Sequence, residues 1–391
     1  MSELLESRWH DTKEALLEGL SGNRKSVMAV TLENTRKYLS ESATAGATSA
    51  GNVATLNRVI LPVIRRVMPT VIANELVGVQ PMTGPVGQIH TLRVRYADTS
   101  AGAGVVAGEE ALSPFKIAAA YSGNEVSATP KANSTASLEG AAGKRMSIQI
   151  LKQVVEAKSR KLSARWTFEA AQDAQAQQGI DIEAEIMAAL AQEITAEIDQ
   201  EILSSLQNLA GAAVETYDQA TVSGVATFVG DEHAALAVQI NRIANLIAQR
   251  TRRGAGNWAV VSPFALTILQ SATTSAFART TEGTFEAPTN TKFVGTLNSS
   301  MRVYVNAYAT DDTPILVGYK GSSESDAPAF YCPYIPLMSS GVVLDPTTFE
   351  PVVSFMTRYG YVELSNAASS LGNAADYLGL VGVTSGNVKF S

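Results

Sequence analysis

The sequence contains little of what several common function classes need. One of its 391 residues is a cysteine, Cys332, and three are histidines. A single cysteine excludes an intrachain disulfide and fits a reducing compartment. No apolar run reaches the roughly 18 residues that a membrane helix requires, so we expect no membrane-spanning segment. The N-terminus is too acidic and too charged for a signal peptide, so we expect the chain to fold in cytoplasm.

Charge is also scarce. Charged residues make up 17% of the chain, against a usual share of about 25%, and small residues take their place. Two explanations remain open. The surface is suited to large protein–protein contacts, in which few charges must lose their water, or the source proteome is simply rich in alanine. The net charge of −7 argues against tight attachment to nucleic acid along the whole chain.

Motifs for catalysis, metal binding or nucleotide binding are weak. The stretch GAAGKR at 140–145 resembles a phosphate-binding loop, but it lacks the first glycine and the Ser or Thr that would hold magnesium. Cys332 has aromatic neighbours and no nearby histidine, which indicates a buried thiol. Asp311 and Asp312 indicate a turn, and the histidines are isolated in the sequence (His10, His90 and His233). We therefore expect no enzyme, no cofactor and no metal site.

The N-terminal part predicts an arm followed by short helices. Residues 3–40 have the spacing of an amphipathic helix, and the small residues of Ser40–Gly51 indicate a flexible linker. Residues 56–76 place apolar side chains on one helical face. Pro62 and Pro69 interrupt that face, which favours two short helices meeting at an angle.

A hairpin and a long helix are predicted next. Alternating apolar and polar residues predict half-buried strands at 88–96 and 146–150. The 49 residues between them, 97–145, are dominated by Gly, Ala and Ser, so we expect a projecting hairpin that neighbouring subunits order. An apolar stripe at i+4 spacing predicts a long helix at 167–209, which Gly179 can interrupt.

The C-terminal half predicts an α/β region and then an aromatic core. The α/β region, 231–345, has a helix at 232–252, a strand at 258–261, a helix begun by Ser262 and Pro263, and strands at 302–305 and 315–319. Seven aromatic residues follow within 329–362. Four prolines divide this segment, so we expect short buried strands joined by fixed turns (Pro333, Pro336, Pro346 and Pro351).

Two blocks of opposite charge are the remaining signal. A basic block precedes the long helix, and residues 179–209 of that helix carry acidic residues with no Lys or Arg. One interpretation is two solvated faces or a pairing within the chain. The sharper interpretation is electrostatic pairing between subunits, which sets register more than affinity. The candidate contact residues are Lys158, Arg160, Lys161, Asp181, Glu183 and Glu185.

Several short sequence motifs, taken in order along the chain, resemble those of one protein family. They are GVQPM with PxGQ at 78–88, EAKSR at 156–160, VGYKG at 317–321, FYCPY at 330–334 and FEPVVSFMTRYGYV at 349–362. The chain resembles the major capsid proteins of T4-type contractile-tailed bacteriophages, over most of 56–362. The resemblance implies an α+β, HK97-like capsid fold with an N-terminal arm, an extended β-hairpin loop, a long spine helix, and peripheral and axial domains.

That fold divides the chain into blocks. The resemblance implies an N-terminal arm at 1–55, a peripheral domain at 56–96 and 146–230 that includes the spine helix, and an extended loop at 97–145. It also implies an axial domain at 231–340 and a return to the peripheral domain, with a C-terminal tail, at 341–391. The short hairpin region leaves no room for the domain that larger relatives insert there, so we expect a separate decoration protein instead.

The implied function is structural. Copies of the chain are expected to form hexamers and pentamers of an icosahedral or prolate head shell around double-stranded DNA, without sequence-specific binding and without a membrane. Portal, vertex or decoration proteins and a scaffold are the expected partners. The shell of the virion is the expected location, with assembly in the host cytoplasm. The alternatives are a cargo-enclosing nanocompartment subunit of the encapsulin type and a cytosolic α/β enzyme.

The resemblance also raises the question of maturation. The family's assembly protease cuts after Glu in a Leu/Ile-x-Glu context, and Leu39-Ser40-Glu41 fits that pattern. The candidate bond therefore joins Glu41 to Ser42. Because the chain begins at Met1, we expect the arm to be retained.

Overall fold

The structure is a computed structural model, and it describes most of the chain after residue 71. The described residues are 9, 13, 17, 22, 25–34, 72–102, 104–109, 111, 121–123, 132–140, 143–178, 182–222, 229–251, 253–272, 277–279, 291–298, 300–324, 326–364 and 374–388. Helices and strands both occur in these ranges, so the α+β class is confirmed. The helices among them include none that is long and apolar enough to cross a membrane. The helices expected at 56–76 fall largely outside the described residues.

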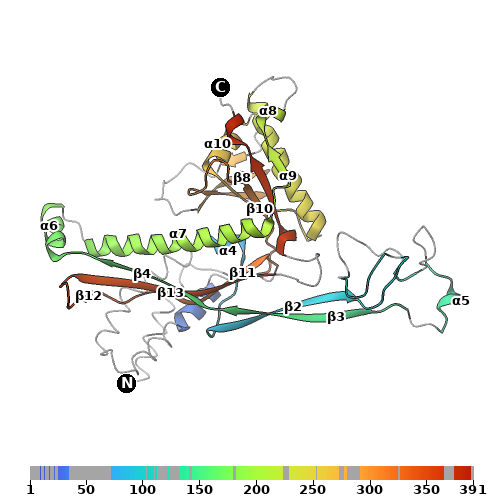
Figure 1. Cartoon of the computed structure of the whole chain (residues 1–391), viewed down its shortest axis with the longest axis horizontal. Coiled ribbons are helices and arrows are strands. Elements are labelled where there is room, and N and C mark those ends of the chain that lie inside the picture. The colour runs from blue at the N-terminus through green and yellow to red at the C-terminus, as the bar shows by residue number, and fades with distance from the viewer. Residues whose placement is uncertain are drawn as a thin grey trace.

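Figure 1 shows an elongated limb with a lobe standing on its middle. The limb contains a two-stranded hairpin at one end and a five-stranded sheet, along which helix α7 (Ile182–Ala210) runs. The lobe contains a seven-stranded sheet with α9 (Val229–Thr251) and α10 (Pro263–Ser271) packed on it.

The predicted hairpin is confirmed and is longer than its sequence pattern. Strands β2 (Val86–Tyr96) and β3 (Met146–Glu156) pair antiparallel without a register shift from Val86–Glu156 to Tyr96–Met146. The segment between them contains a short helix, α5 (Thr135–Leu138), and a small apolar cluster of its own (Tyr96, Val105, Ala111 and Tyr121). The Gly, Ala and Ser content of the loop did not predict this cluster. The cluster depends on contact between the rings of Tyr96, at the end of β2, and Tyr121, within the loop.

The aromatic segment forms long strands instead of the short strands we expected. The five-stranded sheet has the order β1 (Gly78–Val79), β11 (Ala329–Ser339), β13 (Pro351–Glu363), β12 (Val343–Leu344), and β4 (Lys158–Arg165) also pairs with β13. Pro333 and Pro336 lie within β11, where its pairing with β13 shifts register. These irregularities accommodate residues that cannot donate a main-chain hydrogen bond, so the prolines bend the strand without ending it.

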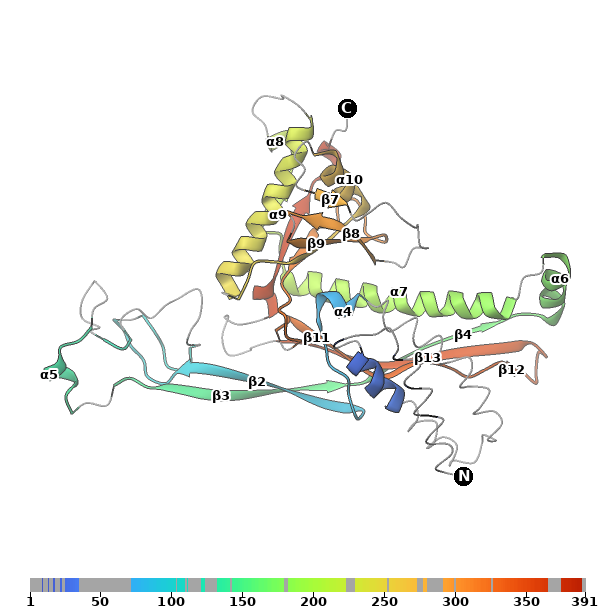
Figure 2. The same ribbon diagram turned by 180° about the vertical axis from the view of Figure 1, so that it is seen from behind.

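The long helix predicted at 167–209 is two helices. They are α6 (Phe168–Gln178) and α7, and Figure 1 shows α6 turned away from the axis of α7 at the end of the limb. Helix α7 buries the face that includes Ile194, Ile198 and Ile202. A helix that includes residues 25–34 lies on the other side of β13 in Figure 2, and its Asn34 amide donates to the main-chain oxygens of Met82 and Tyr334 at 2.8 and 2.9 Å.

The seven-stranded sheet collects strands from distant parts of the chain. Its order is β5 (Glu215–Tyr217), β14 (Leu378–Val383), β10 (Ile315–Gly318), β6 (Trp258–Val261), β9 (Met301–Asn306), β8 (Thr291–Leu297), β7 (Phe277–Arg279). Shorter helical turns are α8 (Gln219–Val222), η1 (Ala374–Tyr377) and η2 (Ser385–Asn387). The strands expected at 258–261, 302–305 and 315–319 are confirmed, and the Ser262 hydroxyl caps α10 by accepting from Ala265 N at 3.1 Å.

At three strands, sheet membership differs from the expected division of the chain into blocks. Strand β14 lies in the seven-stranded sheet between β5 and β10, although we expected residues 341–391 to return to the other domain. Strand β5, expected in the block 146–230, is also part of this sheet. Strand β11, expected in the block 231–340, belongs to the five-stranded sheet. Pairing between remote strands decides these assignments, and apolar patterns do not specify the partner.

Candidate assembly surfaces

One face of the β2–β3 ribbon carries several exposed apolar side chains among polar ones, and we call it the hairpin face. Side chains of facing pairs lie on the same side of the ribbon, so every second residue of both strands contributes to this face. Its exposed apolar members are between 52% and 68% exposed (Val86, Met146, Ile148, Ile150 and Val154). An isolated two-stranded ribbon is only marginally stable in water. The hairpin face is therefore suited to contact with another protein surface.

Arg160 is the centre of a polar network within the subunit. Alternation along β4 turns Arg160, Leu162 and Ala164 toward the core. Its guanidinium donates to Glu197 at 2.6 Å and to Glu201 at 2.5 Å, both on α7. Its Nε donates to the Tyr359 hydroxyl of β13 at 2.6 Å, and that hydroxyl donates in turn to Glu201. The network joins β4, β13 and α7.

The charges of this network stabilise one another. Burial disfavours the charged guanidinium, but the hydrogen bonds with Glu201 and Tyr359 outweigh that effect and raise the pKa of Arg160. Burial also opposes ionisation of Glu201, and the hydrogen bonds from Arg160 and Tyr359 reverse this and lower its pKa. For Arg160, the structure therefore shows pairing within the chain, one of the two interpretations that the sequence left open.

The other predicted contact residues are only partly near this network. Lys158 lies on the same face of β4 as Arg160, and its charge helps to lower the pKa of Glu201. Lys158 and Lys161 are exposed, and Lys161 lies on the opposite face of β4 from Arg160. Glu183 and Glu185 lie in the first turn of α7, about 20 Å along the helix from Glu197 at 1.5 Å per residue. Asp181 lies outside the described residues, as do Glu41 and Ser42. The Glu197–Glu201 pair, spaced i to i+4, was the sequence signal that could have identified the partners of Arg160.

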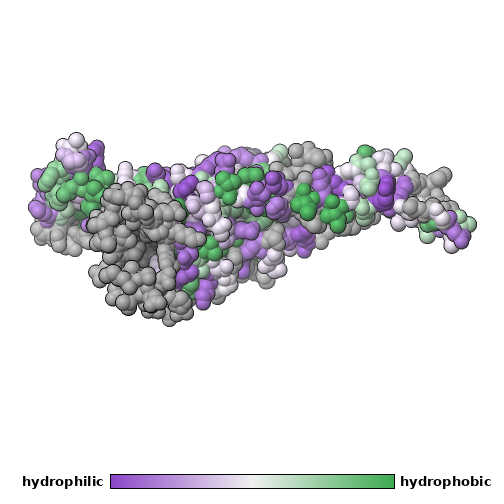
Figure 3. All heavy atoms as spheres, turned by 90° about the horizontal axis from the view of Figure 1, so that it is seen from below, coloured by the Kyte–Doolittle hydropathy of each residue, from purple (hydrophilic) through white to green (hydrophobic). Residues whose placement is uncertain are grey.

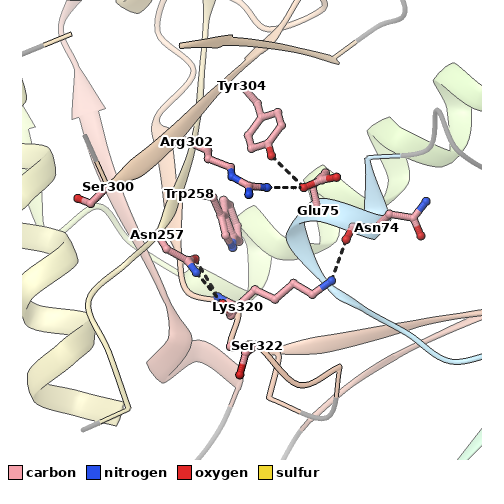
Figure 4. Close-up of a pocket in the computed structure, with 10 residues that line it drawn as sticks. Asn74, Glu75, Asn257, Trp258, Ser300, Arg302, Tyr304, Lys320 and Ser322 are labelled. Carbon is pink, nitrogen blue, oxygen red and sulfur yellow. Dashed lines mark hydrogen bonds and ion pairs between the residues drawn. The ribbon is translucent and has the colours of Figure 1, made fainter. Parts of the chain in front are cut away.

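A cavity of about 470 Å³ lies between α4 (Ala73–Leu76) and the ends of the inner strands β6, β9 and β10 of the seven-stranded sheet (Figure 4). Arg302 donates to the Glu75 carboxylate at 2.8 Å, and the Tyr304 hydroxyl lies 3.4 Å from the same carboxylate. Lys320 Nζ donates to the main-chain oxygen of Asn74 at 2.8 Å. These interactions tie α4 to the sheet, so the cavity is a junction inside the subunit in which both cations are engaged.

The cysteine and the histidines that were considered for catalysis or metal binding differ in their burial and contacts. Cys332 is 2% exposed, and burial raises its pKa to about 12, which disfavours the thiolate. The buried His233 places Nδ1 2.6 Å from the Ser271 hydroxyl and so links α9 to α10. His90 is exposed on the hairpin, and His10 lies outside the described residues. Among the residues that the structure describes, no group of three or more His, Cys, Asp or Glu could hold a metal ion.

The GAAGKR stretch closes the base of the hairpin loop. Arg145 forms an ion pair with Asp98 at 3.1 Å, and its main-chain oxygen accepts from the Tyr121 hydroxyl at 2.6 Å. The hydrogen bonds with Asp98 raise the pKa of Arg145. This basic residue therefore holds two ends of a loop together.

Comparison with known proteins supplies the family. The model of the family described as major capsid protein Gp23 matches residues 53–383. The major capsid protein of Vibrio phage KVP40 is 30% identical, with 84% of this chain and 80% of that protein covered. The major capsid protein of Enterobacteria phage T4 is 31% identical, with 83% and 78% covered.

Solved phage structures are similar to this chain at low sequence identity. A chain of Mycobacterium phage Bobi aligns with a TM-score of 0.48 at 14% identity, covering 81% of this chain and 90% of that chain. The capsid of Myoviridae phage XM1 aligns with a TM-score of 0.43 at 9% identity, covering 79% and 89%. The family match spans most of this chain, and the relatives share the name major capsid protein, which favours a phage head over a nanocompartment or an enzyme. The chain belongs to the family of Gp23 major capsid proteins, which form the head shell of T4-type phages.

Proposed function

We propose that copies of this chain assemble as hexamers and pentamers into an icosahedral or prolate shell that encloses double-stranded DNA. The observation that carries the proposal, beside family membership, is the exposed hairpin face. Burying a large aliphatic side chain contributes roughly 1.5–3 kcal/mol. Ile148 and Ile150 alone would then contribute about 3–6 kcal/mol per contact when a neighbour covers them. Repeated over many subunits, such contacts are sufficient to hold a shell together.

The parts of the subunit have distinct proposed roles. The N-terminal arm at 1–55 and the loop at 97–145 contact neighbours. The five-stranded sheet with α7 as its spine is the peripheral domain, and the seven-stranded sheet is the axial domain around the centre of each hexamer or pentamer. Grouping by sheet supports this division, with β5 and β14 in the axial domain and β11 in the peripheral domain.

Further proposed partners follow from the architecture of the family. Portal, vertex or decoration proteins and a scaffold contact the shell, assembly takes place in the host cytoplasm, and DNA is enclosed without sequence-specific binding. The net charge of −7 supports weak attraction to DNA. The subunit catalyses no reaction in this proposal, which the burial of Cys332 and His233 supports.

Maturation has its own test. We propose that the bond between Glu41 and Ser42 stays intact in the particle. Mass spectrometry of purified particles is expected to find the arm attached, and a shell protein that starts at Ser42 would contradict this.

The hairpin proposal is tested with the double variant I148K/I150K. The variant is expected to fold like the unmodified chain, by circular dichroism and thermal melting, because both side chains already face water. It is expected to form no shells in sedimentation and electron microscopy, since a neighbour would have to bury two charges.

The matched control is V238K, which changes a 66% exposed side chain on the outer face of α9. This control is expected to assemble. Normal shells from I148K/I150K would refute the role of the hairpin face.

A further inference from the structure

The cavity between α4 and the seven-stranded sheet has the size and lining of a ligand-binding site. Its volume of about 470 Å³ lies within the range of about 300–1,000 Å³ that is usual for small-molecule pockets. Four segments line it, which are α4, the starts of β6 and β9, and the residues after β10. The lining is mainly polar, in contrast to the hydrophobic patches that Figure 3 shows along the limb. The cavity is therefore suited to a polar occupant.

Strand pairing gathers the side chains on the sheet side of the cavity. Trp258 of β6 is the register partner of Arg302 on β9 and of Gly318 on β10, so these three positions share one face of the sheet. Gly318 has no side chain, and the Trp258 ring fills the space that a methyl group there would need. Figure 4 shows Trp258 between Arg302 and Lys320, and the side chains of both cations extend toward α4.

The indole nitrogen of Trp258 is a buried donor without an acceptor. Trp258 is 2% exposed, and its Nε1 has no hydrogen-bond partner among the residues that the structure describes. In Figure 4 this nitrogen lies at the end of the ring nearer to Lys320. Indole can only donate, and leaving a buried donor unpaired is unfavourable. Because Trp258 lines the cavity, an acceptor atom bound there can pair with it.

Other groups of the lining also supply donors. The Arg302 side chain is 61% exposed and uses one amino group on the Glu75 carboxylate at 2.8 Å. A guanidinium has several N–H donors in a planar fork, so Arg302 can pair with a second acceptor group. Ser300 and Ser322 add hydroxyl groups. Glu75 is the one carboxylate among the lining residues in the described part of the chain.

Lys320 forms a fixed wall of the cavity. Its Nζ donates to the main-chain oxygen of Asn74 at 2.8 Å and lies 3.2 Å from Glu324, which offsets part of its charge. Its main-chain N donates to Asn257 Oδ1 at 3.0 Å, and its main-chain oxygen accepts from Asn257 Nδ2 at 2.6 Å. A ligand would therefore meet groups that are already in position.

We propose that this cavity binds a small oxyanion through a phosphate or carboxylate group. The oxygens of the ligand accept hydrogen bonds from Trp258 Nε1 and from Arg302, and such charge-assisted bonds are stronger than neutral ones. The site goes beyond the proposed function, because it exists in the unassembled subunit. Helix α4 leads into β1 of the five-stranded sheet, so a ligand bound between α4 and the seven-stranded sheet ties the two sheets together.

Calorimetric titration of the full-length unassembled subunit tests the site. Inorganic phosphate and succinate are the probes, and sodium chloride at matched ionic strength is the reference for general ion effects. Saturable binding and a higher melting temperature are expected with at least one probe. Binding of phosphate alone or succinate alone supports the proposal and identifies the group. If water alone fills the cavity, neither probe binds, and that result overturns the proposal while leaving the shell function intact.

Two variants test whether the probe binds in the cavity. R302K keeps a cation beside Glu75 but removes the other guanidinium donors, and W258F removes the indole N–H but keeps an aromatic ring. Each is expected to weaken binding about tenfold or more, as loss of one charge-assisted hydrogen bond implies. The matched control is R242K, which changes a 72% exposed arginine of α9 that pairs with Glu215 at 3.1 Å. This control is expected to bind the probe unchanged.

Circular dichroism and melting without the probe check the fold of each variant, and R302K decides if W258F does not fold. Unchanged binding by R302K, or an equal loss in R242K, would overturn the proposal.

Tryptophan emission locates the ligand independently. In a chain with W9F and W166F, Trp258 is the only tryptophan that remains. Its emission is expected to shift with the same midpoint as the calorimetric titration. Binding that leaves this emission unchanged would place the anion elsewhere and contradict the proposal.

Discussion

Asp199 offers a sharp test of how the spine helix is packed, through the substitution D199N. Its carboxyl group lies on the buried face of α7, is 1% exposed, and accepts a hydrogen bond from Ile72 N at 3.0 Å. Burial disfavours the charged carboxylate, and the Ile72 hydrogen bond offsets this in part. The pKa of Asp199 is consequently raised from 3.8 to about 7.

The sign of the effect on stability follows from proton linkage. Between pH 3.8 and about 7 the folded subunit keeps a proton on Asp199 that the unfolded chain has lost. The stability due to this group is therefore fully present below pH 3.8 and is lost as the pH rises to about 7. A shift of about three pKa units, at 1.36 kcal/mol per unit, corresponds to roughly 4 kcal/mol.

The amide in D199N has the same shape and still accepts from Ile72 N, but it does not ionise. The variant is expected to match the unmodified subunit near pH 4 and to exceed it in free energy of unfolding by a few kcal/mol at pH 8. Denaturant unfolding of the full-length unassembled subunit at both values measures this difference.

Two controls separate ionisation from packing. D199A leaves the Ile72 N–H without its acceptor, so it is expected to lose stability at both pH values. E193Q changes an exposed carboxyl of the same helix and is expected to change little at either. An equal effect of D199N at pH 4 and pH 8 would refute the reasoning, because it would mean that Asp199 has the same charge in the folded subunit throughout.

Two further predictions concern packing inside the subunit. R160M removes the cation shared by Glu197, Glu201 and Tyr359 and is expected to lower the free energy of unfolding by about 1–3 kcal/mol. K161M, on the exposed face of the same strand, is expected to change it by less than about 0.5 kcal/mol, and equal losses would contradict the network. G318A places a methyl group 2.1 Å from the Trp258 ring, so a loss of at least about 2 kcal/mol and a shift in tryptophan fluorescence are expected. G143A, where a methyl group meets nothing within 4 Å, is the control.

Local elements were predictable where the residues carry their own signal. The alternation of apolar and polar residues predicted the hairpin strands correctly, because side chains of any strand point to opposite faces in turn. Ser262 followed by Pro263 predicted the start of α10, since Ser favours the N-cap of a helix and Pro its first turn. The prediction that Pro333 and Pro336 divide the segment into short strands was wrong, because the pairing of β11 with β13 accommodates both prolines at register shifts. The exposed surfaces were predictable only in part: the hairpin was expected to contact neighbours, but Phe349, which is 71% exposed, was expected to lie in a buried core.

The sequence by itself determined the shell family, the α+β class and the scarcity of catalytic groups. Those properties reside in residue identity and order. The tertiary structure decided which remote strands pair, so β14 joined the seven-stranded sheet and β11 the five-stranded one. It also decided that Arg160 meets Glu197 and Glu201 of its own chain. Such contacts depend on the position of each backbone in space, and charge or periodicity along the chain does not specify the partner.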